Sequence, residues 1–190
     1  MNYCSDCGNT VKLGTPPGDD RPRYICESCG TIHYDNPKVV VGSIPEKDGN
    51  ILLCRRAIEP RFGKWTLPAG YLENGETVAQ GARREALEES GARIEILAPY
   101  ALYNICYVNQ VYLMFRAQLI DAGIKAGNES SEVRLFLEKD IPWDEIAFTV
   151  IEKTLQQYFN DRPAGLFPFH IGNIQKSISK REVNEGTLDG

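Results

Sequence analysis

The sequence predicts an α+β domain, within the broader α/β class, that follows a small cysteine-rich unit. Three observations predict it: strand-like runs joined by a hairpin turn signal, a helical pattern rich in carboxylates, and two C-x-x-C pairs. The 190 residues, 42% hydrophobic and 25% charged, are an ordinary globular composition. This length allows one packed domain and a small appendage.

The cysteine pairs lie in residues 1–36, around a Gly- and Pro-rich stretch that reads as a loop. The gap between the pairs fits the roughly 15–20 residues of a four-cysteine zinc site. A glycine follows each pair, as a tight turn toward thiolates needs. Two redox-active motifs are the alternative, but such a motif needs a helix after it. We therefore predict a closed structural Zn²⁺ site, with the ligands Cys4, Cys7, Cys26 and Cys29.

The second domain is expected over residues 37–160. Residues 38–44 and 50–56 are strand-like runs, and Asp48-Gly49 between them signals a hairpin. Thr77 and Gln80 form a capping box that begins a helix, and Gly91 ends it. Small alanines recur on one side of this helix, which predicts that this side packs on a sheet and that the acidic face stays free.

Further elements follow from periodicity. A second helix is predicted over residues 148–160, and Pro163 ends it. Residues 161–190 show no periodicity and are expected to form a C-terminal arm or a partly disordered tail. The remaining predicted strands are residues 93–97, 101–108, 110–119 and 132–137.

Composition restricts the location and the partners of the protein. No apolar run approaches the roughly 18 residues of a membrane span, and the first residues are not a secretory signal. We therefore expect a cytoplasmic protein without a membrane partner, whose six cysteines are metal ligands or buried thiols, with Cys54 and Cys106 as the thiols. A net charge of -5 argues against a nucleic-acid partner.

Three carboxylates, Glu85, Glu88 and Glu89, lie within one turn of the first helix. Like charges at this spacing repel by about 0.2–0.5 kcal/mol per pair, so the cluster is unfavourable alone. A hard divalent cation reverses the sign, because Mg²⁺ takes carboxylate oxygens and keeps positions open for a phosphate-bearing substrate. The cluster therefore indicates metal-dependent phosphate chemistry.

The surrounding residues resemble the Nudix box, G-x5-E-x7-R-E-U-x-E-E-x-G-U, where U is a bulky aliphatic residue. Ala86 and Ala92 are smaller than the usual aliphatic residues, a departure that concerns packing only. Seven fixed positions rarely coincide by chance. They are Gly70, Glu76, Arg84, Glu85, Glu88, Glu89 and Gly91.

The resemblance implies a Nudix fold, a mixed sheet flanked by helices, and hydrolysis of a phosphoanhydride with Mg²⁺ or Mn²⁺. Cations suit this reaction because they neutralise phosphate oxygens and orient the attacking water. Arg84 is expected to orient the glutamates through ion pairs, with Glu76 and Glu88 as candidate partners. The implied metal ligands are Glu85, Glu88, Glu89 and the backbone carbonyl of Gly70.

Nudix enzymes often take a further carboxylate, as metal ligand or general base, from a loop before a late strand. Glu129 and Glu132 are the candidates, and we favour Glu129 because it lies in a turn-rich segment. A basic residue near the end of the second strand can contact substrate phosphates. Strand alternation should send Arg55 and Arg56 to opposite faces, so at most one reaches the site. Which glutamate acts as the base stays open.

Aromatic residues offer a second kind of contact with a substrate. They could stack on a base or a flavin ring, although isolated aromatics more often belong to the core. The candidates are Trp65, Tyr71, Tyr103, Tyr107 and Tyr112.

A zinc ribbon before a Nudix domain occurs in NADH pyrophosphatases and in a group that resembles FAD and ADP-ribose pyrophosphatases. The SQPWPFPxS-type motif of the first group is absent after the box, whereas segments such as WTLPAGYLE and ESSEVRLF resemble the second. We therefore expect a small-molecule dinucleotide substrate, FAD or ADP-ribose, with NADH as the alternative.

A non-enzymatic regulator, with a degenerate Nudix fold that senses nucleotides and a ribbon that binds nucleic acid, is the other alternative. Residues 1–36 carry three basic and five acidic side chains, so this unit would repel phosphates. The box also keeps all its carboxylates. We expect the ribbon instead to pack on its own catalytic domain or to build a homodimer.

Overall fold

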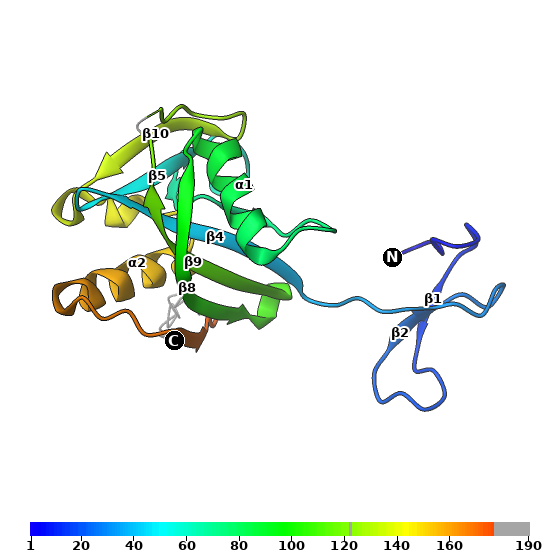
Figure 1. Cartoon of the computed structure of the whole chain (residues 1–190). Coiled ribbons are helices and arrows are strands. Elements are labelled where there is room, and N and C mark those ends of the chain that lie inside the picture. The colour runs from blue at the N-terminus through cyan, green and yellow to red at the C-terminus, as the bar shows by residue number, and fades with distance from the viewer. Residues whose placement is uncertain (122, 177–190) are drawn as a thin grey trace, which may run out of the picture. The chain divides into compact units, whose positions relative to one another are not determined.

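The computed structural model describes residues 1–121 and 123–176. The chain divides into two compact units, Met1–Pro37 and a second unit that begins at Lys38. Figure 1 shows the elements of each unit. None of the helices in the described part of the chain is long and apolar enough to cross a membrane.

The first unit is a small antiparallel sheet with the order β1-β2-β3. A glycine follows each cysteine pair with a left-handed backbone, Gly8 at φ 74° and Gly30 at φ 78°. Their amides donate to the carbonyls of Cys4 and Cys26, which closes each turn around the pair. The strands are β1 (Lys12–Gly14), β2 (Arg23–Ile25) and β3 (Ile32–His33).

The second unit is built on a mixed sheet with the order β10-β5-β4-β9-β8-β11, so the predicted mixed sheet is confirmed. The pairs β4·β9 and β8·β11 are parallel, and the other pairs are antiparallel. Its strands are β4 (Lys38–Lys47), β5 (Asn50–Arg56), β6 (Trp65–Thr66), β7 (Ala69–Tyr71), β8 (Ile94–Ile105), β9 (Gln110–Leu119), β10 (Ser130–Phe136) and β11 (His170–Asn173).

Strands β4 and β5 form the predicted hairpin, but they pair with each other only next to the turn. Asp48 and Gly49 both have positive φ, 50° and 79°, as a tight two-residue turn requires. Cα partners are recorded only at Glu46↔Ile51 and Lys47↔Asn50. Beyond them β7 pairs with β4, and β6 pairs with β5. The two strands therefore diverge, and short strands cover the edges that they expose.

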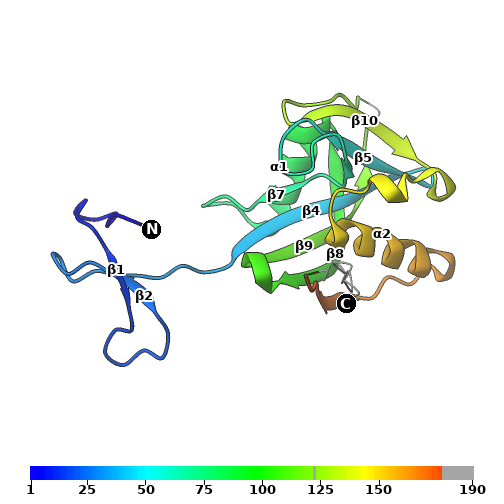
Figure 2. The same cartoon turned by 180° about the vertical axis from the view of Figure 1, so that it is seen from behind.

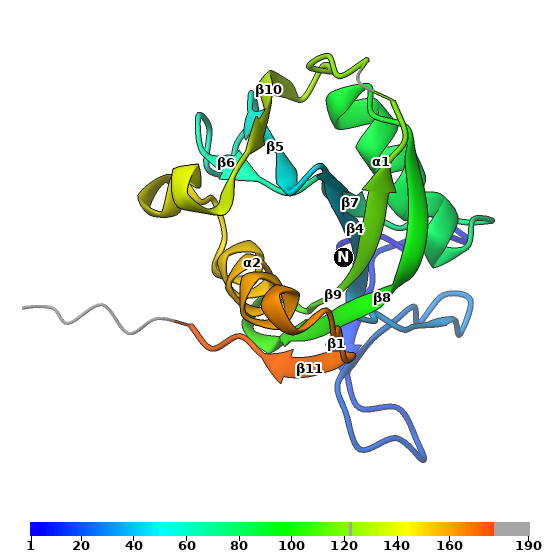
Figure 3. The ribbon, with the colours of Figure 1, turned by 60° about the vertical axis from the view of Figure 1, so that its left-hand side comes forward.

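Two helices lie on opposite faces of this sheet, α1 (Val78–Ser90) and α2 (Thr149–Asp161) (Figures 2 and 3). The capping box of Thr77 and Gln80 and the left-handed C-cap Gly91 begin and end α1 as predicted. Each helix packs on a core of its own, because Ala86 belongs to one hydrophobic cluster and the apolar face of α2 to the other. The described part of this unit also contains four short 3₁₀ helices: η1 (Cys106–Val108), η2 (Glu138–Asp140), η3 (Trp143–Glu145) and η4 (Arg162–Ala164).

The structure corrects the sequence prediction in the region of β8. The expected strands 93–97 and 101–108 are one strand that passes through Pro99 with two register shifts. A proline is compatible with a strand where a bulge removes the need for its missing amide. Residues 106–108 form η1 instead of strand, so Cys106 is exposed, whereas Cys54 is a buried thiol as expected.

The segment after α2 contains a strand that the sequence pattern did not reveal. β11 adds to the edge of the sheet by parallel pairing with β8. None of its four residues is fully buried, so the sequence shows no apolar run there, which explains the missing signal. Residues 177–190 of the expected arm or tail lie outside the described residues.

Candidate functional site

The sequence predicted that the acidic face of α1 stays free. The structure shows instead that part of this face is buried. Glu85 and Glu89 are only 8% and 6% exposed, while Glu88 is exposed. Residues four apart lie on the same face of a helix, so Glu85 and Glu89 turn together toward the strand β7 and the interior. Only Glu88 projects toward solvent.

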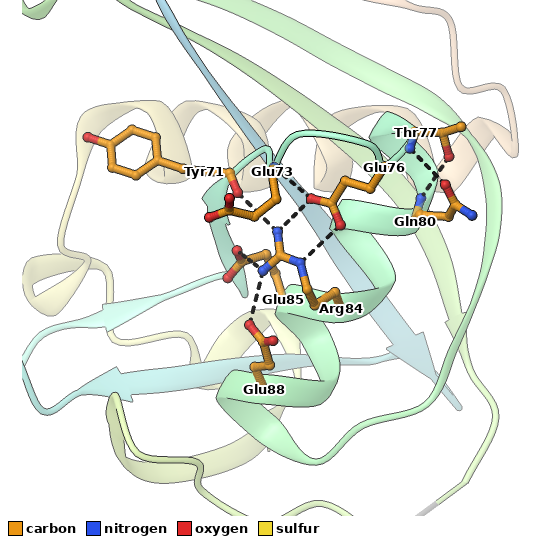
Figure 4. Close-up of polar contacts among 8 residues, drawn as sticks. All are labelled: Tyr71, Glu73, Glu76, Thr77, Gln80, Arg84, Glu85 and Glu88. Carbon is orange, nitrogen blue, oxygen red and sulfur yellow. Dashed lines mark hydrogen bonds and ion pairs between the residues drawn. The ribbon is translucent and has the colours of Figure 1, made fainter. Parts of the chain in front are cut away.

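Arg84 gathers the carboxylates around one guanidinium (Figure 4). Its Nε and Nη2 donate to the two oxygens of Glu76 at 3.0 and 2.7 Å. Its Nη1 donates to Glu85 at 2.6 Å and to Glu88 at 3.0 Å. Nη2 also reaches the carbonyl of Tyr71 at 3.0 Å, which ties α1 to β7. The expected partners Glu76 and Glu88 are present, and Glu85 is a third that the sequence did not reveal.

Gly70 lies directly beside the carboxylate of Glu85. A Cβ on Gly70 would collide with both carboxylate oxygens of Glu85. Only a glycine permits this approach of backbone to carboxylate. The arrangement brings the two expected ligand groups, the Glu85 carboxylate and the Gly70 backbone, to one point.

The carboxylates of this site differ in their pKa values. Hydrogen bonds from Arg84 lower the pKa of Glu76 to about 2. Burial, reinforced by the Glu85 carboxylate, raises the pKa of Glu89 to about 8. Burial also raises the pKa of Glu85, although Arg84 opposes the shift. Among the described residues, Glu89 Oε2 has no hydrogen-bond partner. A buried carboxylate oxygen without a donor fits a cation as its missing partner.

The pairing of β10 with β5 separates the two candidate glutamates and the two arginines. Glu132 is opposite Arg55 in the register and pairs with it at 3.6 Å. Arg56 and Glu129 instead line the cavity beside α1. Their charges act on Glu89 in opposite directions, since Arg56 lowers its pKa and Glu129 raises it. One member of each candidate pair, Arg56 and Glu129, thus lines this cavity.

Arg56, Arg84 and Glu129 line a cavity of about 870 Å³, within the usual size range of ligand sites. Glu85, Glu88 and Glu89 line it, as do Tyr71 and Tyr112. Of the other candidate aromatics, Trp65 and Tyr103 belong to the core, and Tyr107 lines a second cavity.

Gln110 and Phe148 also line this cavity, although nothing in the sequence predicts either of them there. Gln110 Nε2 donates to the hydroxyl of Tyr71 at 2.9 Å, which fixes the side-chain amide at the wall of the cavity. Phe148 is the N-cap residue of α2 and lies under the guanidinium of Arg56, 5.2 Å from ring centroid to Cζ. No local pattern marks either residue, because chain segments distant in sequence form the wall.

The first unit brings the four predicted cysteines together. Their sulfur atoms all lie within 4.8 Å of one another. Side chains surround the sulfurs, with His33 Nε2 3.3 Å from Cys4 Sγ and Asn9 donating to Cys7 Sγ at 3.4 Å. Four convergent thiols suit a tetrahedral zinc ion and leave no position for a substrate. This set fits a structural metal.

Comparisons with known proteins agree with both units. A family model described as NUDIX domain matches residues 36–156, and a zinc-ribbon model described as Nudix N-terminal matches residues 2–35. A crystal structure of a NUDIX hydrolase from Nitrosomonas europaea is 55% identical, with a TM-score of 0.90, and the match covers 93% of this chain and 100% of that chain.

Two kinds of curated relative are similar to the chain. An ADP-ribose pyrophosphatase from Methanocaldococcus jannaschii is 32% identical over 129 residues, which are 66% of this chain and 75% of that protein. A NAD-capped RNA hydrolase NudC from Vibrio cholerae is 27% identical over 169 residues, which are 85% of this chain. The match spans 60% of that NudC protein's length.

Proposed function

Because the chain belongs to the Nudix family, we propose that it is a pyrophosphohydrolase that cleaves the diphosphate of FAD or ADP-ribose. FAD would yield FMN and AMP, and ADP-ribose would yield AMP and ribose 5-phosphate. One observation carries the proposal: the carboxylates of Glu85, Glu88 and Glu89 line a single cavity in which a buried oxygen of Glu89 has no partner among the described residues.

In this proposal Glu85, Glu88, Glu89 and the Gly70 carbonyl hold Mg²⁺ or Mn²⁺. When bound, such cations neutralise the diphosphate oxygens and orient a water for in-line attack. The donor set supports this, because hard cations prefer oxygen ligands and keep open positions for phosphate. Arg84 holds Glu85 and Glu88 in place by the hydrogen bonds described above.

Two further residues have proposed roles in the cavity. Arg56 contacts the substrate phosphates, because it is the arginine of its pair that lines the cavity. Glu129 is a metal ligand or the general base, because it lines the same cavity as the α1 glutamates and is exposed, so that it can reach a water. Glu132 and Arg55 pair with each other and take no part.

The relatives support ADP-ribose more strongly than NADH as the substrate. The 32% identical relative is an ADP-ribose pyrophosphatase, of which the match covers 75%. The NudC relative from Vibrio cholerae is 27% identical, and the missing SQPWPFPxS-type motif argues against NADH. NudC acts on a capped RNA, however, so the proposed lack of a nucleic-acid partner needs a direct test.

We propose that residues 1–36 form a zinc ribbon and residues 37–160 the hydrolase domain of a cytoplasmic homodimer. Four convergent thiols support the zinc. Light scattering of the purified protein tests the dimer, and a mass of a single chain would contradict it. Fractionation of cells tests the location.

The experiment is product analysis with purified protein and Mg²⁺ or Mn²⁺. FAD, ADP-ribose, NADH and NAD-capped RNA are incubated in ¹⁸O water, and the labelled products are identified. We expect AMP from FAD or ADP-ribose, with the label showing which phosphorus is attacked. Faster cleavage of NADH or capped RNA would favour the alternative. Ligand binding without release of AMP from any substrate would favour the nucleotide-sensing regulator.

A further inference from the structure

A second cavity of about 320 Å³ adjoins the acidic cavity. It lies among η1, β9 and the first residues of α2, with Ile174 after β11 closing it. Tyr107 and Val108 contribute from η1, and Val150 contributes from α2. None of these residues belongs to the acidic box.

The two cavities share their wall. Pro60, Gln110, Tyr112 and Phe148 line both of them. A molecule whose phosphates lie beside the α1 carboxylates would pass Tyr112 and Phe148 to reach the second cavity. The shared residues include two aromatic rings and one amide, a combination typical of sites that bind rings and fix their orientation.

The chemistry of the second cavity differs from that of the first. No acidic side chain is among the described residues that line it, and Arg61 is the one charged side chain there. Its other lining residues are mainly aliphatic and aromatic, with Gln110 and Thr149 as polar exceptions. Burying a free sugar against the aliphatic and aromatic side chains would leave its hydroxyl groups without partners. A planar ring suits this cavity better.

We propose that the second cavity binds one heteroaromatic ring of the substrate, so that the enzyme selects diphosphates with a ring-bearing group on that side. This inference rests on the proposed function, because it assumes that the diphosphate lies at the α1 carboxylates. In this proposal the ring of the substrate contacts Tyr107, Val108, Tyr112 and Phe148, which therefore determine specificity. A site that recognised the diphosphate alone would not need these contacts.

The test measures direct binding, so that it does not depend on hydrolysis. AMP, FMN and ribose 5-phosphate are titrated calorimetrically into the full chain with Mg²⁺ present. AMP is ribose 5-phosphate with a ring added, so this pair isolates the contribution of the ring. Because base–aromatic stacking is substantial, we expect AMP or FMN to bind about tenfold more tightly than ribose 5-phosphate.

Two variants alter the cavity in different ways. Val108→Trp fills it and Tyr107→Ala removes a wall, and both positions tolerate substitution because Val108 is 48% and Tyr107 52% exposed. Each variant should raise the Kd of the favoured ring-bearing phosphate about tenfold and change that of ribose 5-phosphate less than about twofold. Phe62→Ala removes an exposed aromatic that lines neither cavity and should change neither value.

The proposal is overturned if the wild-type protein shows no ring-dependent binding. It is also overturned if both variants weaken ribose 5-phosphate as much as AMP or FMN, or weaken none of them. Failure of the proposed function has a different signature, the absence of AMP release from FAD and ADP-ribose by the wild-type protein. The two failures can therefore be told apart.

Discussion

Gly70 in β7 and Glu85 in α1 approach so closely that a side chain on Gly70 would occupy the space of the Glu85 carboxylate. The contact joins the strand before the acidic helix to the proposed metal ligands. The need for glycine at this position is steric, since a Cβ would meet the carboxylate. It is not conformational, since the φ of Gly70 is not positive.

Gly70→Ala should therefore displace the Glu85 carboxylate and reduce hydrolysis. We expect about a 100-fold loss of kcat/KM, of the size seen when metal ligands lose their support, and a higher Mg²⁺ concentration for half activity. Steady-state kinetics across a Mg²⁺ titration measure both. Gly123→Ala is the matched control, because only Asp121 Oδ1, at 3.9 Å, lies near its added Cβ. Equal activity of both variants would contradict the steric argument.

Arg84 should matter for stability as well as for activity. Arg84→Ala leaves the carboxylates of Glu76 and Glu85 without their cation and should lower the free energy of unfolding, because removing one partner leaves the other charge unpaired. Arg84→Lys should recover only part of this, because an ammonium cannot form the two parallel bonds to Glu76. Urea unfolding measures the change. Arg83→Ala, on the exposed face of the same helix, should be neutral.

Glu89 should lower the stability of the metal-free protein. Its pKa is raised to about 8 in the fold, so the folded state binds a proton that the unfolded chain releases near its ordinary pKa. The stability of the wild-type protein should therefore fall between pH 5 and pH 8. Glu89→Gln removes this dependence, and without added Mg²⁺ or Mn²⁺ it should raise Tm at pH 8 by about 3 °C or more.

The same Glu89→Gln variant should lose most of its hydrolytic activity, because the amide is a poor substitute for a carboxylate ligand. Melting curves of the wild-type protein and of Glu89→Gln at pH 5 and pH 8 give the Tm difference at each pH. No chelator is added, because a chelator would also remove the zinc. A Tm difference that does not widen with pH would contradict the assigned pKa.

Glu129 and Glu132 form a matched pair for testing the further carboxylate. Glu129 lines the cavity, whereas Glu132 pairs with Arg55. Glu129→Gln should lower kcat by about 100-fold or more if it is the general base. Glu132→Gln should leave kcat within about twofold, because an exposed ion pair contributes little. The opposite ranking would assign the role to Glu132.

The ribbon should need its metal, and the hydrolase domain should not. Cys26→Ser should abolish stoichiometric zinc binding, measured by mass spectrometry of metals, and expose the remaining ribbon thiols to alkylation. The melting transition of the second unit should stay, because both hydrophobic clusters consist of residues from that unit. Loss of that transition together with zinc would contradict the separation.

Local signals in the sequence predicted the elements near the site well. The Thr77 and Gln80 capping box, the Gly91 C-cap and the Asp48-Gly49 turn are all present, because each acts within a few residues of the chain. Local signals failed at β8, where a bulge accommodates Pro99, and at β11, whose pairing with β8 joins distant segments. The second cavity had no signal at all, since four separated segments form it.

The sequence by itself determined the family, the cysteine cluster and the acidic turn, because spacing along one helix or knuckle places these groups together without help from the rest of the chain. Only the tertiary structure decided between Arg55 and Arg56 and between Glu129 and Glu132, because the register of β10 on β5 sets which side chains meet. It also decided which carboxylates are buried. Burial depends on the whole fold, and it gives Glu89 the raised pKa and the unpartnered oxygen on which the proposed metal site rests.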